Sequence, residues 1–274
     1  MQNAPAPARS LRIGVTVSGI CRSRPDDYEV DTRFRLAREA GVFDYCEVSP
    51  PQGQVDLFAA AAEKHGMPIL VGSFYYVVGR DEALLDWHMA VTRRMGGDAQ
   101  NIQIMHRDAD GRPLADTDVV DAYLRAYDAG GRHDVAPCFE IHVNMWSEHF
   151  GRVSRVAAAV ERRGVPFNIT LDHSHVIFKM DNPDEQKVQG MDEALASGGL
   201  ILDPTRDGNV CGQWIERNYV VHAHARSTVP GNPVNTLARH ADGRFGRGIQ
   251  YPFVRPRPGE WNHDWDEDAL SPWK

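Results

Sequence analysis

A strand–helix–strand pattern between residues 136 and 180 constrains the fold more than any other part of this sequence. The two outer pieces, FEIHV and FNITL, are rich in residues that favour β-strands, and apolar and polar side chains alternate in the first. Between them, Val153, Val156, Ala157 and Val160 recur at the spacing of one helix face. A helix between two strands forms a βαβ unit, which places its strands parallel and adjacent. The carboxyl ends of both strands therefore lie at one edge of a sheet.

The alternation of strand and helix recurs through the rest of the chain. Besides the two strands of the first pattern, strands are expected at 11–19, 45–50, 68–78, 99–105 and 219–227. Helices are expected at 31–41, 55–66, 81–97, 117–131, 151–164, 183–199 and 213–218. This rhythm predicts an α/β protein with a (β/α)8 TIM-type barrel whose eighth strand is missing or atypical. An open doubly wound sheet is the alternative, although no GxGxxG motif follows the first strand.

Three segments are expected along the chain. Residues 1–10 are rich in Ala and Pro and predict a flexible tail, and residues 11–227 contain no composition break and predict one barrel domain. Residues 228–274 are rich in Pro, Gly and Trp and predict a loop segment over the barrel mouth. The apolar run GIQYPFV carries Pro252, which disfavours a central strand. We therefore expect a shortened form of a longer protein, with a barrel left open between its first and seventh strands.

Bulk properties exclude two classes of partner. The formal net charge is -8, whereas a nucleic-acid surface needs a basic footprint. No apolar run reaches the roughly 18 residues of a membrane span. The four cysteines form no CxxC pair and there is no signal-peptide pattern, which predicts reduced thiols and a cytoplasmic location.

Polar side chains gather at the carboxyl ends of three expected strands. They are Glu140 and His142, then Asp172 and His175, then His222 and His224. Residues two apart on a strand share a face, and the carboxyl ends of parallel strands meet at one edge. Carboxylate and imidazole ligands suit one divalent metal ion, such as Mn, Mg, Co, Fe or Zn. Each residue alone has a simpler explanation as a core histidine or a salt-bridge partner, but three strands share the feature.

Four further residues lie near these strand ends. His106 ends the fourth strand and could line a pocket, and Trp146 suits either a pocket wall or the core. Lys179 and Arg226 follow strands that carry candidate ligands, where a cation could hold a substrate oxygen. Solvated loop charges are the alternative for both.

The chain resembles the xylose isomerase-like TIM-barrel superfamily, the sugar phosphate isomerase/epimerase group, over most of residues 11–253. Three motifs carry the resemblance: Glu140 in FEIH, the D-x-x-H pair Asp172 and His175, and the H-x-H pair His222 and His224. The resemblance implies that Glu140, Asp172 and His224 bind the metal. His224 is preferred because the second histidine of this pattern is the usual ligand.

The same resemblance implies the remaining roles. His175 and Arg226 would contact substrate, with Glu140 and His175 as catalytic groups. The other candidates for substrate contact are His142, His222, His106 and Trp146. The family also has a strand-eight glutamate as a fourth ligand. Here Glu260 and Glu267 lie in loop-like sequence, so three protein ligands are expected.

The resulting hypothesis is a divalent-metal-dependent isomerase or epimerase of a sugar or sugar phosphate. The metal would hold two substrate oxygens and stabilise an enediolate while a proton moves between carbons. A metal-dependent lyase on a keto-sugar needs the same site, and a non-catalytic metal-binding subunit of a larger enzyme would account for the missing glutamate. DNA-repair endonucleases share the barrel, but the acidic balance argues against them. The expected partners are a carbohydrate and, for the open barrel, a second copy or a completing partner chain.

Overall fold

Seven parallel strands form one curled sheet in the computed structural model, which describes residues 11–20, 28–231, 235–239, 243, 245–246, 251–258 and 264–274. The strands are β1 (Gly14–Thr16), β2 (Tyr45–Glu47), β3 (Ile69–Tyr76), β4 (Ala99–Ile104), β5 (Ala136–Ile141), β6 (Ile169–Asp172) and β7 (Val220–His224). Each strand pairs in parallel with the next one along the chain. This sequential parallel order confirms the predicted TIM-type architecture.

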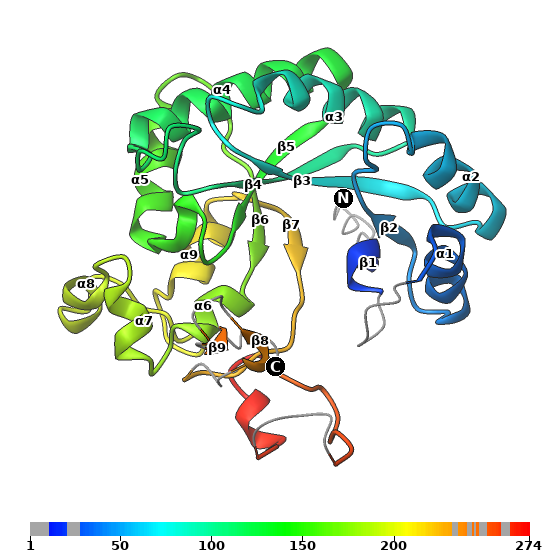
Figure 1. Ribbon diagram of the computed structural model, residues 1–274. Coiled ribbons are helices and arrows are strands. Elements are labelled where there is room, and N and C mark those ends of the chain that lie inside the picture. The colour runs from blue at the N-terminus through cyan, green and yellow to red at the C-terminus, as the bar shows by residue number, and fades with distance from the viewer. Residues whose placement is uncertain are drawn as a thin grey trace, which may run out of the picture.

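Helices alternate with the strands, and those between β1 and β6 lie on the outer side of the curled sheet (Figure 1). They are α1 (Val30–Glu39), α2 (Val55–His65), α3 (Glu82–Arg94), α4 (Asp116–His133) and α5 (Phe150–Glu161). Four shorter helices, α6 (Ser174–Phe178), α7 (Pro183–Lys187), α8 (Asp192–Ala196) and α9 (Val210–Glu216), lie between β6 and β7. The single helix expected at 183–199 is wrong: it is divided into α7 and α8. Gly190 lies between them with φ of 67°, a left-handed conformation that ends a helix.

The first strand is shorter than predicted, because a 3-10 turn (Val17–Gly19) follows it directly. Glycine is required within this strand. A Cβ added to Gly14 would lie 2.3 Å from the ring of Tyr45 on β2, so no larger residue fits without moving that ring. The close approach lets the tyrosine side chain lie across the start of the sheet.

The alternation of β5 separates an apolar outer layer from a polar interior. Phe139 packs outward against Tyr123 of α4, with ring centroids 4.9 Å apart, and Tyr123 packs in turn on Phe167. Glu140, between two outward apolar residues, points to the other face and is completely buried. The interior of the sheet therefore contains charged and amide side chains, which need partners when removed from water.

The sheet is open in the described part of the chain, where no strand pairs with the outer edge of β1 or of β7. The strands β8 (Asn235–Arg239) and β9 (Phe245–Gly246) form a separate antiparallel pair, so residues 228–274 contain more than loop. The possible eighth strand spans 248–254. Residues 248–250 lie outside the described residues, and residues 251–254 form no strand. The proposed division of the chain at residue 228 stays a prediction.

Two further expectations concern membranes and thiols. None of the helices in the described residues is long and apolar enough to cross a bilayer. Cys46, Cys138 and Cys211 are free and buried, whereas Cys21 lies outside the described residues.

Candidate metal centre

Glu140, Asp172 and His224 converge from the carboxyl ends of three neighbouring strands. One ligand atom from each lies within 4.8 Å of the other two. The register of the sheet accounts for this, because Asp172 on β6 pairs with His224 on β7 and Glu140 on β5 pairs with Thr170 on β6. The structure therefore brings together the three residues that the sequence predicts as metal ligands.

Glu140 is an ionised carboxylate held by two amides. Its Oε2 accepts hydrogen bonds from Asn101 Nδ2 at 2.7 Å and Gln103 Nε2 at 2.5 Å. Its Oε1 lies 3.2 Å from Nδ1 of His224. Burial alone would raise the pKa of Glu140, but the hydrogen bond and charge of His224 outweigh it and lower the pKa to about 2.

Asp172 has one satisfied oxygen and one with no hydrogen bond. Oδ1 accepts the backbone N–H of Ser174 at 3.1 Å and the hydroxyl of the same residue. Oδ2 is buried without a hydrogen-bond partner among the described residues, 3.3 Å from His175 Nε2 and 3.5 Å from Arg226 Nη2. Burial opposes ionisation, but the charges of His175 and Arg226 hold the pKa of Asp172 well below its usual range. A buried anionic oxygen of this kind suits a cation.

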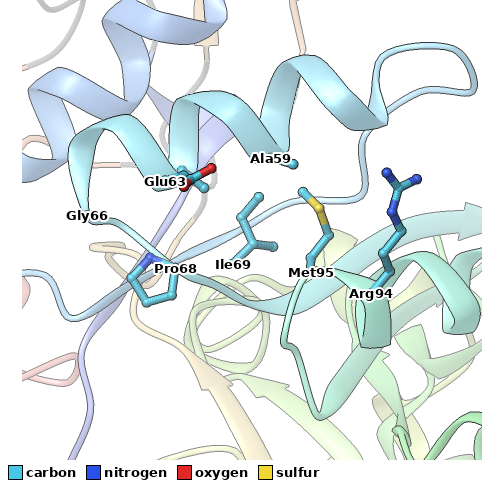
Figure 2. Close-up of a pocket in the computed structure, with 8 residues that line it drawn as sticks. Ala59, Glu63, Gly66, Pro68, Ile69, Arg94 and Met95 are labelled. Atoms are coloured by element: carbon cyan, nitrogen blue, oxygen red, sulfur yellow. The ribbon is translucent and has the colours of Figure 1, made fainter.

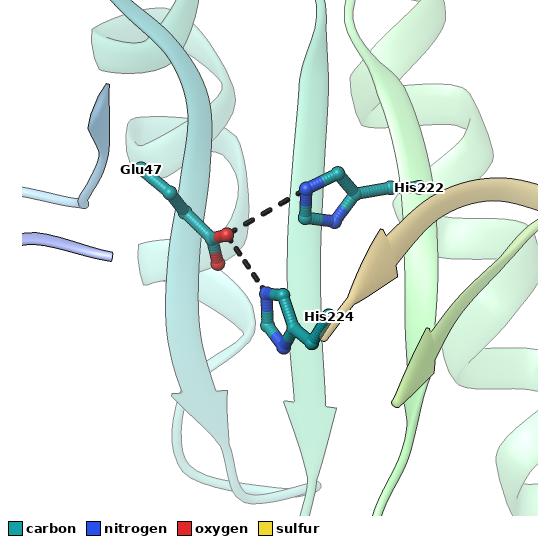
Figure 3. Close-up of side chains that lie close together, drawn as sticks. All are labelled: Glu47, His222 and His224. Carbon is teal, nitrogen blue, oxygen red and sulfur yellow. Dashed lines mark hydrogen bonds and ion pairs between the residues drawn. The ribbon is translucent and has the colours of Figure 1, made fainter. Parts of the chain in front are cut away.

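The ring of His224 lies between two carboxylates. Nδ1 faces Glu140, and Nε2 lies 2.8 Å from Oε2 of Glu47 (Figure 3). Burial alone would lower the pKa of His224, but Glu47 and Glu140 raise it well above the usual value. Without a metal, a protonated imidazole therefore supplies the positive charge that these carboxylates require.

Glu47 is a site residue that the sequence analysis missed. It ends β2, is 3% exposed, and its Oε2 is approached by both His222 and His224 (Figure 3). These three residues form a second group of potential metal ligands. A glutamate that ends a short apolar strand, YCE, is the same signal that identified Glu140. Asn101 was missed as well, because an amide in a strand carries no metal-ligand signal of its own.

The side chain of His222 lies on the same face of the curled sheet as that of His224, as their two-residue spacing predicted. Its Nε2 lies 3.4 Å from the hydroxyl of Tyr45, and its Nδ1 lies 3.4 Å from Oγ1 of Thr170. Burial lowers the pKa of His222. Both nitrogens of this ring thus have a neighbouring hydroxyl.

His142 and His175 pack against one another beside Glu140. Their ring centroids are 3.9 Å apart, and with Glu140 they form a third group of potential ligands. Burial, together with the charge of His175, lowers the pKa of His142 to about 4. Both ring nitrogens of His175 are buried without a hydrogen bond to any described residue. Nδ1 of His142 is close to the carbonyl oxygen of Val143, and Nε2 of His175 has only the ion-pair contact with Asp172 among the described residues.

The remaining sequence candidates lie further out. Nδ1 of His106 is 3.0 Å from the carbonyl oxygen of Asn144, and the residue belongs to none of the three ligand groups in the described residues. Trp146 is 1% exposed and packs on Phe139 in the core, which favours its packing alternative. Arg226 reaches the centre through Asp172.

Both interpretations of Lys179 from the sequence, a solvated loop charge and a substrate contact, are wrong. The side chain is completely buried, and Nζ lies 2.8 Å from Glu148 Oε1 and 3.4 Å from Glu185 Oε2. It is therefore neither a solvated charge nor a group free to hold substrate. Burial of a lysine requires such acidic partners.

A pocket of about 430 Å³ lies elsewhere, between α2, α3 and the start of β3 (Figure 2). Pro68 precedes β3, and Arg94 is the last residue of α3. The pocket is thus at the amino-terminal edge of the sheet, opposite to the strand ends that carry Glu140 and His224. In barrels of this type the chemistry belongs to the carboxyl edge, so we assign no catalytic role to this pocket.

The donor set fits a divalent cation, and the strand-eight glutamate that the sequence resemblance implies as a fourth ligand has no counterpart in the described residues. Two buried carboxylates and an imidazole, with an Asp172 oxygen that lacks a hydrogen bond, are a suitable set for Mn²⁺, Fe²⁺, Co²⁺ or Zn²⁺. Glu260 lies outside the described residues. Glu267 pairs with Lys274 at 3.3 Å and belongs to no ligand group.

Comparison with known proteins supports the fold. The sequence matches no family model and no curated protein. The structure is similar to D-allulose 3-epimerase from Methylomonas sp. with additional C-terminal residues, with a TM-score of 0.51 and 15% identity over 78% of this chain and 84% of that chain. It is also similar to D-psicose 3-epimerase from Clostridium cellulolyticum H10 with D-tagatose, with a TM-score of 0.51 and 12% identity over 81% and 76% of the two chains. It is similar as well to a Methylomonas sp. D-allulose 3-epimerase in complex with D-allulose, with a TM-score of 0.50 and 13% identity over 78% of this chain and 83% of that chain. At these low identities, the structural similarity shows a common fold and nothing further.

Proposed function

We propose that this protein is a divalent-metal-dependent isomerase or epimerase of a sugar or sugar phosphate. The observation that carries the proposal is the convergence of Glu140, Asp172 and His224 within 4.8 Å at the carboxyl edge of a TIM-type sheet. The names of the similar structures support the choice of substrate class, since two of them are described with a bound ketose, D-allulose or D-tagatose.

The three converging residues would hold the metal. Both carboxylates are ionised at neutral pH, since the pKa of each is lowered. When bound, a divalent metal would polarise neighbouring carbonyl and hydroxyl oxygens of the substrate and stabilise negative charge there. Asn101 and Gln103 would orient Glu140 through its Oε2, leaving Oε1 toward His224.

Other residues of the centre would bind substrate and move the proton. Arg226 is about 30% exposed beside Asp172, a position from which its guanidinium can donate to a substrate oxygen. A carboxylate with a pKa of about 2 is a weak base at neutral pH, so the structure favours Glu140 as a ligand over Glu140 as a base. His175, 3.3 Å from Asp172, is then the preferred group for proton transfer. His142 packs on His175 and would fix its ring plane.

Metal analysis and a substrate panel test the proposal together. We expect about one divalent ion per purified chain, and strong loss of that ion in Glu140→Gln, Asp172→Asn and His224→Ala. Asp203→Asn is a matched control, because Asp203 is a partly exposed carboxylate that caps a turn at Thr205. Incubation with ketoses in D₂O should place deuterium from solvent on the epimerised carbon. Unchanged metal content in all three site variants would show that the ligand assignment is wrong.

Two other functions remain candidates on a specific observation. No eighth strand and no fourth carboxylate join the centre within the described residues. This favours a metal-binding subunit that is completed by a second copy or a partner chain. A lyase on a keto-sugar is the other candidate, because it would need the same site. A lyase would release a shorter or unsaturated product in the same panel, and a non-catalytic subunit would bind metal without any turnover.

A further inference from the structure

Glu47 contacts the candidate centre from a strand that is distant from β5, β6 and β7 in the sheet order. It ends β2, while His224 ends β7, and four strands separate β2 from β7 in the sheet order. The side chain is 3% exposed, and its Oε2 lies 2.8 Å from Nε2 of His224. Its Oε1 lies 3.4 Å from Nδ2 of Asn101, the amide that also donates to Glu140. The carboxylate is therefore fixed at both oxygens.

The contact determines which nitrogen of His224 is available to a cation. An imidazole that keeps a hydrogen on Nε2 has its lone pair on Nδ1. Nδ1 is the nitrogen on the Glu140 side, 3.2 Å from Oε1 of that residue. We propose that Glu47 is the positioning residue of the metal centre, which holds Nε2–H of His224 so that Nδ1 faces Glu140 and Asp172. The inference rests on the proposed metal function of those three residues.

The competing arrangement is a metal held by a carboxylate oxygen of Glu47 and by the Nε2 atoms of His222 and His224. The three residues do form a group of potential ligands. However, Nε2 of His222 is 3.6 Å from the Glu47 oxygen and 3.4 Å from the Tyr45 hydroxyl, and its Nδ1 has Thr170 as a neighbour. His222 is thus satisfied by hydroxyl groups. Asp172, in contrast, has a buried oxygen that forms no hydrogen bond with any described residue, which favours the centre on the Glu140 side.

Nitrogen NMR distinguishes the two arrangements directly. In the full chain labelled with ¹⁵N-histidine and loaded with Zn²⁺, His224 should show a zinc-bound Nδ1 and a protonated Nε2. His224→Gln assigns its signals. The reverse pattern, with Nε2 bound to zinc, would overturn the proposal and move the metal to the Glu47 side.

Metal affinity tests the positioning role without reference to activity. Titration with Zn²⁺ should give an affinity about 10- to 100-fold weaker in Glu47→Gln, the usual effect of losing a carboxylate behind a ligating histidine. Stoichiometry should stay the same, and Glu47→Asp should recover part of the affinity. Glu82→Gln is the control: Glu82 is a carboxylate at the start of α3 that accepts hydrogen bonds from Tyr76 and Gly79 and belongs to none of the ligand groups found in the described residues.

The outcomes separate this inference from the function on which it rests. A Glu47→Gln protein that melts like the wild type and binds Zn²⁺ equally tightly would overturn the positioning role and leave the metal centre intact. Failure of the wild-type protein to bind any divalent ion would overturn the proposed function itself. If Glu47→Gln does not fold, the NMR experiment on the wild type still decides the matter.

Discussion

At the scale of the single residue, Arg226 is the side chain best placed to separate substrate binding from metal binding. Its guanidinium lies 3.5 Å from Asp172 and is partly exposed. Arg226→Ala should lower kcat/KM by roughly 10- to 100-fold, the effect of losing one hydrogen bond to a charged group, while metal content stays at the wild-type level. Arg206→Ala, at an exposed arginine between β6 and β7, should change neither quantity. Loss of metal in Arg226→Ala would show that the arginine supports the ligands instead.

His88 gives a pH dependence that is independent of the centre. It stacks on Phe74 with ring centroids 4.1 Å apart, and burial lowers its pKa to about 4, against a smaller opposing effect of Asp81. The unfolded chain therefore binds a proton between pH 6.5 and 4 that the folded protein does not. The contribution of neutral, buried His88 to the free energy of unfolding is fully present above pH 6.5. It declines as the pH falls, by up to about 3 kcal/mol at pH 4.

Urea unfolding of the wild type and His88→Phe at several pH values measures this effect. The phenylalanine keeps the stack without a titrating group, so the wild type should lose more stability than the variant from pH 7 to pH 4. Parallel pH profiles for the two proteins would show that His88 is not the cause.

The sequence could predict those residues of the centre that belong to neighbouring strands. Asp172 and His224 are the last residues of their strands and Glu140 is the last but one, and sequential parallel order places those ends together. Glu47 also ends a strand, but its contact with His224 could not be predicted from the sequence. Glu47 and His224 lie on strands that do not pair with each other. The distance between the two side chains depends on the curvature of the whole sheet. The local alternation of apolar and polar residues does not encode that curvature.

At the scale of the element, the buried Lys179 joins three segments that follow β5 and β6. It comes directly after α6, and its partners are Glu148 before α5 and Glu185 in α7. Glu148 also accepts the backbone N–H of Asn144, which has a φ of 67°. The lysine therefore fixes the connection between β5 and α5, next to His142.

Lys179→Met should lower the free energy of unfolding by about 3–5 kcal/mol, because it leaves buried carboxylates without their cation. Adding Glu148→Gln to this variant should restore part of the loss. Denaturant titration of the two variants and the wild type is the measurement. If the free energy of unfolding of Lys179→Met is within 1 kcal/mol of the wild-type value, water reaches the carboxylates of Glu148 and Glu185.

The order of helices and strands was largely predictable, because each period of apolar residues is local. The exceptions depend on contacts or on single residues. The division of the expected 183–199 helix follows from one glycine, and the shortness of β1 accompanies the close approach of Gly14 to Tyr45. Neither effect changes the apolar periodicity from which the elements were predicted.

At the scale of the whole molecule, the described sheet has two free edges, and the proposed metal ligands lie on β5, β6 and β7, next to one of them. β4 and β5 pair on both sides, whereas β1 and β7 pair on one side only within the described residues. Hydrogen exchange should therefore be slowest in β4 and β5 and faster in β7. Saturating Zn²⁺ should slow exchange in β7, which carries His224, and leave β3 and β4 unchanged, because a ligand stabilises the segments that bind it.

Exchange measured by mass spectrometry, with and without Zn²⁺, tests this expectation. Asp172→Asn should show the metal-free pattern in both conditions. Protection that rises equally in every strand would mean that the metal acts on global stability and not on the strands that hold it.

The contact between Glu47 and His224 also has a consequence for synthesis. The two residues are 177 positions apart in the chain. While a ribosome is still adding the residues of α5, two of the three proposed ligands, Asp172 and His224, do not yet exist. A nascent chain at that stage lacks most of the proposed metal centre. The complete ligand set, and with it full metal affinity, is then available only after β7 has been synthesised.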